Sequence, residues 1–151
     1  MKINIIRFQT PSGMTYDAHL EYDRLEINSC FVSITHEYLG GTIKKTSTDF
    51  FSSLMEIRRE FDAQGIKLLC WGARTDVWPN PTQQDWVSGL LANCHIIPQD
   101  LIDGVRIQSK ITGNIFAPAL PEVIGTVTEF EMYVTRFRQY RFPKQSSEGV
   151  D

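Results

Sequence analysis

The sequence predicts one α+β domain, residues 1–143, in which an antiparallel β-sheet carries one helix across its face and a second helix ends the fold. Three observations predict this class. Short β-branched and aromatic runs separated by turn residues fill residues 2–46. Apolar residues then recur at helical spacing over residues 47–64, and a dense apolar run follows at residues 66–79. Residues 144–151 are polar and are expected to form a disordered tail.

The N-terminal part is expected to be a meander of strands. Four strands are predicted, at residues 2–8, 14–22, 25–35 and 42–46. Pro11-Ser12-Gly13 separates the first two, and Gly40-Gly41 precedes the last. The charged pair Asp23-Arg24 is expected to break the chain between the second and third strands.

Residues 47–64 carry the clearest helix signal. The apolar stripe repeats at i, i+4, i+7 and i+11, through Phe50, Leu54, Ile57 and Phe61. Ser47 or Thr48 is expected to cap the N-terminus, and Gly65 stands where a C-terminal capping glycine belongs. The stripe should lie across the meander.

The apolar run at residues 66–79 is expected to return through the core as a strand buried on both faces. It is short, and Gly65 and Pro79 bound it. Gly72 within it indicates a bulge or a close backbone approach, because glycine supplies no side chain to pack.

The C-terminal half carries weaker signals until its last helix. The expected elements are a loop at 80–84, a possible helix at 85–91, strands at 90–97 and 105–111 with a loop at 98–104, a turn at 112–114 and irregular chain at 118–125. Thr126 and Glu129 form a capping box that opens the second helix, and Pro143 ends it.

Charge is distributed unevenly along the chain. The net charge is −3, which does not favour a nucleic-acid binder that relies on a basic face. Residues 76–131 hold seven acidic residues against Arg106 and Lys110, a local net of −5, and a basic segment follows. This acidic middle is either an ordinary solvated surface or a face for a basic protein partner. We expect no signal peptide and no membrane span.

The three cysteines are far apart and sit among apolar neighbours, which favours reduced, buried thiols in a cytosolic protein. Cys70 with His95, or Cys94 with His36, could form a nucleophile pair, although packing is the favoured role of both thiols. Four carboxylates could supply acid–base chemistry, but are better explained as a solvated sheet face: Asp17, Glu21, Asp23 and Glu26. No metal site, cofactor or catalytic residue is predicted.

Arg74 and Asp76 stand two residues apart, so on a strand their side chains would share a face. The arginine, flanked by tryptophans, could hold a carboxylate or carbonyl of a partner. The favoured interpretation is an internal Arg–Asp pair that fixes the loop to Pro79.

The central segment also carries a resemblance. Residues 72–79 read Gly-Ala-Arg-Thr-Asp-Val-Trp-Pro, and Gly-Thr-Val-Thr-Glu at residues 125–129 enters the last helix. Over residues 50–140 the chain resembles small bacterial proteins with a Gly-Ala-Arg-x-Asp-Val-aromatic-Pro core, which look like immunity proteins of polymorphic toxin and contact-dependent growth inhibition systems. The family often has Ser-Gly-Met after the proline, where this chain has Asn80-Pro81-Thr82.

The resemblance implies a non-enzymatic cytoplasmic antidote that binds a cognate toxin domain, here expected to be a nuclease, and covers its active site. From the net charge and the absence of a long apolar run, we expect no direct contact with nucleic acid or membrane. The residues expected to bind the partner are Asp85, Asp100, Asp103, Arg74, Asp76 and Trp78. The alternatives are a small cytosolic enzyme that uses a cysteine or a carboxylate pair, and a scaffold module without a toxin.

Overall fold

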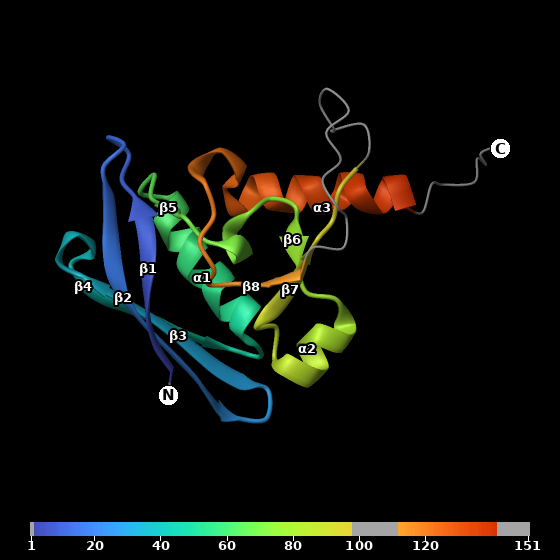
Figure 1. The fold of residues 1–151 in the computed structure, drawn as a ribbon, viewed down its shortest axis with the longest axis horizontal. Helices are drawn as coiled ribbons and strands as arrows, with labels where there is room; N and C mark the ends of the chain where they lie inside the picture. The colour runs from blue at the N-terminus through green and yellow to red at the C-terminus, as the bar shows by residue number, and fades with distance from the viewer. Residues whose placement is uncertain (1, 98–111, 142–151) are drawn as a thin grey trace.

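The computed structural model describes residues 2–97 and 112–141 and has the predicted α+β architecture (Figure 1). Among the described residues, five strands form one antiparallel sheet in the order β4-β3-β2-β1-β5, and three form a second sheet in the order β6-β7-β8. The helix α1 lies against β3 and β4, and α3 packs on α1. The loop and strand expected within residues 98–111, Pro143 and the tail lie outside the described residues.

The first sheet contains β1 (Lys2–Gln9), β2 (Thr15–Glu26), β3 (Ser29–His36), β4 (Gly41–Ser47) and β5 (Lys67–Leu68). The predicted break at Asp23-Arg24 is wrong, because both residues pair with β3. The chain turns instead at Ile27 and Asn28. Asn28 has a φ of 60°, in the left-handed region that asparagine tolerates better than most residues.

The helix α1 (Phe50–Asp62) buries the whole predicted stripe against this sheet. Its N-terminal cap is Asp49, whose side chain accepts a hydrogen bond from the Ser52 amide at 2.7 Å, so the predicted caps Ser47 and Thr48 are wrong. Ser47 still belongs to β4, where it pairs with Cys30. Gly65 has a φ of 70°, as expected of a residue that ends a helix in the left-handed region.

The segment 66–79 is not the continuous strand that was predicted. Only β5 joins the first sheet; a 3-10 turn, η2 (Trp71–Ala73), follows, and β6 (Val77–Trp78) belongs to the second sheet. Where the chain leaves the first sheet, the backbone at Gly72 closely approaches the backbone at Ile115, and the Gly72 amide donates to the Ile115 carbonyl at 2.8 Å. A Cβ on Gly72 would lie 2.8 Å from the Ile115 Cβ, so the expectation of a close backbone approach is confirmed.

The second sheet is completed by β7 (Leu91–Cys94) and β8 (Thr112–Asn114), so the predicted turn at 112–114 is wrong and the strand at 90–97 is confirmed over its centre. The loop predicted at 80–84 is also wrong, because these residues begin the helix α2 (Pro81–Val87). Asn80 and Gln83 form a capping box at its N-terminus, in which each side chain accepts a hydrogen bond from the backbone N–H of the other residue.

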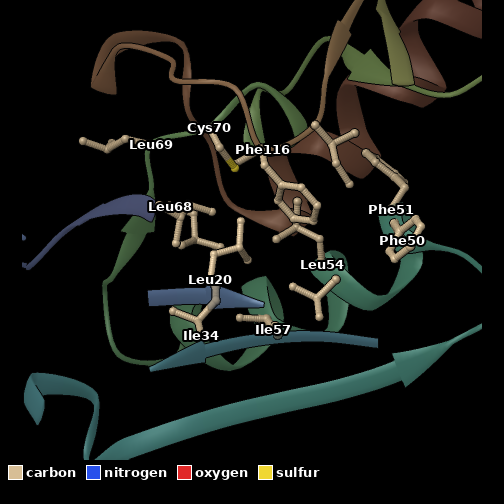
Figure 2. Packing of buried hydrophobic residues seen from close by; sticks show 14 of the residues in the cluster. Leu20, Ile34, Phe50, Phe51, Leu54, Ile57, Leu68, Leu69, Cys70 and Phe116 are labelled. Atoms are coloured by element: carbon tan, nitrogen blue, oxygen red, sulfur yellow. The ribbon is translucent and has the colours of Figure 1, made fainter. Parts of the chain in front are cut away.

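The core lies between the inner face of the first sheet, α1 and the turn between the two sheets (Figure 2). Leu20 and Ile34 contribute from the sheet and Leu54 and Ile57 from α1, all fully buried. The final helix, α3 (Val127–Arg141), follows a short 3-10 turn, η4 (Pro121–Val123). Its predicted capping box is confirmed: Thr126 and Glu129 exchange hydrogen bonds of 2.7 and 3.1 Å.

Candidate functional site

Arg58 anchors the central segment from the buried side of α1. Its side chain is almost fully buried, and the guanidinium donates to the carbonyls of Gly72 and Ala73 at 3.2 Å each and to that of Gly125 at 3.1 Å. Burial lowers the pKa of the guanidinium. One side chain thereby joins α1 to the turn at Gly72 and to the entry of α3, and so fixes the segment that leads to Trp78.

Arg74 and Asp76 pair with each other. Two hydrogen bonds of 2.8 Å join the guanidinium to both carboxylate oxygens, and the side chains are only 14% and 15% exposed. The guanidinium also lies 4.8 Å over the Trp71 ring, and the bond to Asp76 raises its pKa. The fork is therefore already occupied within the chain and braces the segment ahead of Trp78.

Trp78 forms one side of an aromatic cleft. Its ring stacks on His95 with centroids 3.8 Å apart, and Phe137 of α3 meets both rings edge-on at 5.4 and 5.3 Å. The cleft has a volume of about 830 Å³ and lies between α3 and residues 78–84. The His95 Nε2 donates to the Trp78 carbonyl at 3.1 Å, and burial lowers the pKa of this imidazole, so the ring is neutral near pH 7.

The rim of the cleft carries exposed side chains from two helices. Pro81 and Gln84 of α2 line the cleft, and Asp85 is exposed on the same helical face, since positions i, i+3 and i+4 are neighbours. Trp86, the next residue, is 82% exposed. Across the cleft, α3 contributes Arg138 and Arg141 together with Glu131, which pairs with Arg59 of α1. The α3 side thus carries two cationic groups and one paired carboxylate, and the exposed charge on α2 is Asp85.

The sequence analysis missed both Arg58 and Trp86, although each left a signal. Arg58 lies at helical spacing between Leu54 and Phe61, within the apolar stripe. Asn80 followed three residues later by Gln83 is a capping-box pattern, which marks the start of the helix that exposes Trp86. Of the other predicted contact residues, Asp100 and Asp103 lie outside the described residues.

The three cysteine thiols are buried, and none has the lowered pKa that activates a nucleophilic cysteine. All three cysteines are buried and free, as predicted. Burial raises the pKa of Cys70 and of Cys94 to about 12, so both are protonated at neutral pH, whereas the thiolate is the nucleophile. His95 is bonded to Trp78, and His36 packs against the rings of Phe8 and Tyr16 in the other sheet.

The predicted carboxylates belong to the outer face of the first sheet. Asp17 accepts from Arg7 at 3.1 Å, and Glu21 lies 2.9 Å from His19. The first pair joins β1 to β2, the second lies within β2, and the Asp17 side chain is 55% exposed. They have the character of a solvated sheet face.

No protein-family model matches the chain, and no curated protein matches it. Within residues 2–97 and 112–141, no helix is long and apolar enough to cross a lipid bilayer. In the same residues, no three histidine, cysteine or acidic side chains gather as a metal site would require. The candidate functional site is the cleft lined by Trp78, together with the exposed residues Asp85 and Trp86 of the adjoining helix α2.

Proposed function

We propose that this chain is a cytoplasmic immunity protein that binds a cognate toxin domain and covers its active site. The observation that carries the proposal is Trp86, 82% exposed at the end of α2, the short helix whose residues Pro81 and Gln84 line the cleft with Trp78. Tryptophan is among the residues that contribute most to binding at protein interfaces. A largely exposed tryptophan on a helix that also lines an aromatic cleft favours a protein-binding surface.

The charges around the cleft support a protein partner. Asp85 stands exposed next to Trp86, on the α2 side, and is the described member of the acidic set that also contains Asp100 and Asp103. A nuclease needs a cationic surface to hold phosphate, and acidic groups on an antidote would steer it onto that surface. Arg138 and Arg141 on the opposite rim would meet a complementary acidic patch.

The central motif then has a structural role with one contact residue. Arg74 and Asp76 brace each other, and Gly72 and Ala73 bind Arg58 through their carbonyls, so we now propose these residues as the support of the site. Trp78 is the member of the motif that lines the cleft. The thiols, protonated and buried, favour this non-enzymatic function over a cysteine enzyme.

The test is protection of cells against the protein encoded by the gene next to this one. We expect wild-type protein to restore growth and to co-purify with that protein, and Trp86→Ala to lose both properties. Met14→Ala is the matched control, because Met14 is 55% exposed and directly follows the β1–β2 turn, and this turn lies far from α2 (Figure 1). If the neighbouring protein is not toxic, or if Trp86→Ala protects as well as Met14→Ala, the proposal is wrong.

A further inference from the structure

The first sheet leaves most of one β1 edge without a strand. On the side away from β2, β5 pairs only with Phe8 and Gln9 of β1, and within the described chain no other strand pairs with β1 there. β5 is two residues long because the chain departs at Leu69 toward Gly72. The rest of β1, from Lys2 to Ile6, continues past the point where its neighbour ends.

The backbone groups that face this edge belong to the odd-numbered residues. The Leu69 amide donates to the Arg7 carbonyl at 2.9 Å, so the polar backbone groups of Arg7 point away from β2. In an antiparallel pair these groups alternate in direction from residue to residue. Ile5 and Ile3 therefore also direct their N–H and C=O groups toward the open edge.

A groove runs beside this edge. It has a volume of about 260 Å³, with Ile5 and Arg7 of β1 on one wall and the segment around Leu120 on the other. Ile6, Leu69 and Phe116 also line it, and all three are buried. Two apolar side chains of the groove are largely exposed, Ile5 at 64% and Leu120 at 69%, and Ile3 of the same strand is 63% exposed. An edge with polar backbone groups thus adjoins a mainly apolar groove that also contains the Arg7–Asp17 pair.

One side chain occupies part of the edge in the free protein. The Asn4 Oδ1 accepts a hydrogen bond from the Ile5 N–H at 2.8 Å. Unpaired strand edges invite other strands, and proteins commonly block them with side chains. The Asn4 oxygen is an acceptor and satisfies only the Ile5 donor, so its bond is one that an incoming strand can exchange for its own.

We propose that this edge binds an extended peptide segment of another protein, which adds as a strand beside β1. The occupant is defined by chemistry: an extended backbone pairs with Ile3 and Ile5, and its alternate apolar side chains enter the groove. The wall at Leu120 favours a single narrow segment over a second copy of this chain, which would bring its own sheet and its own Leu120 wall against the same space. Binding at this edge is independent of the toxin and of the cleft at Trp78.

The probe is the capped peptide acetyl-Lys-Val-Thr-Val-Thr-Val-Lys-amide, titrated into the full chain and followed by NMR. We expect the Ile3 and Ile5 amides to shift and to exchange more slowly with solvent, while the amides of β4 stay unchanged. A peptide N-methylated at alternate residues, in the register that faces β1, should not bind, because it lacks the donors that a strand must supply.

Two variants act on the same edge in opposite directions. Asn4→Ala removes the competing acceptor and should tighten binding about threefold, whereas Ile5→Pro removes an edge donor and should weaken it about tenfold, as one hydrogen bond warrants. If Ile5→Pro does not fold, Leu120→Ser, at an exposed position, should weaken binding through the opposite wall.

Three outcomes would overturn the proposal. One is that millimolar peptide leaves the Ile3 and Ile5 amides unchanged. Another is equal binding of the N-methylated peptide, which would show apolar contact without strand pairing. The third is a wild-type dimer whose interface contains the Ile3 and Ile5 amides, because the occupant would then be a second copy. Peptide binding at the β1 edge and protection of cells against the toxin are measured in separate assays. A failure of peptide binding would therefore leave the immunity proposal standing.

Discussion

Replacing Arg58 with alanine should destabilise the protein by about 3 kcal/mol. The change removes three hydrogen bonds from a charged donor, each worth about 1.5 kcal/mol or more, and leaves the carbonyls of Gly72, Ala73 and Gly125 without that donor. Part of this loss is offset, because the alanine variant no longer incurs the free-energy cost of removing a charged guanidinium from water. For a chain of this size, about 3 kcal/mol lowers Tm by roughly 6–12 °C.

Urea denaturation followed by circular dichroism measures this loss as a lower midpoint at an unchanged slope. Arg59→Ala is the matched control. Its side chain is 53% exposed and pairs with Glu131 at 3.3 Å, a surface contact worth about 0.5 kcal/mol or less. Arg58→Lys should give an intermediate loss, because one ammonium cannot reproduce the planar fork. If Arg58→Ala costs no more than Arg59→Ala, Arg58 does not anchor the central segment.

Three further predictions concern the core. Phe61→Ala should cost about 3–5 kcal/mol in urea denaturation, since Phe61 is 2% exposed, and a loss below about 1 kcal/mol would contradict its packing. Gly72→Ala should cost about 1–3 kcal/mol, because its Cβ would meet Ile115 at 2.8 Å; an unchanged unfolding midpoint would contradict this. The native protein should not react with a thiol reagent at pH 8, given a pKa of about 12 for Cys70, and should expose three thiols on denaturation. A disulfide found by mass spectrometry would refute this.

Sustained periodicity made most of the fold predictable. α1 shows four apolar positions at helical spacing and α3 opens with a capping box, and both helices form where expected. The turn after β2 was predicted at the charged pair Asp23-Arg24, because charged residues are more typical of a turn than an isoleucine is. The actual turn contains Ile27, which is 78% exposed. Turn position there depends on the backbone conformation of Asn28, which residue type alone does not determine.

The central segment shows where periodicity fails. A short apolar run has the same pattern in a buried strand, in a 3-10 turn and in two short strands of different sheets. What separates these possibilities is the contact of Gly72 with Ile115, which lies far along the chain. The exposure of Trp86 was hidden for the same reason, since it depends on how α2 sits against the second sheet.

The most direct test of the immunity proposal is the affinity of Trp86→Ala for the neighbouring-gene protein, measured by titration calorimetry. Truncating a central interface tryptophan costs about 2 kcal/mol or more, so we predict a Kd at least about thirtyfold weaker than wild type. Met14→Ala should bind like wild type. Asp85→Lys should slow association and flatten its dependence on salt. A Trp86→Ala protein that binds as tightly as Met14→Ala would contradict the assignment of this surface.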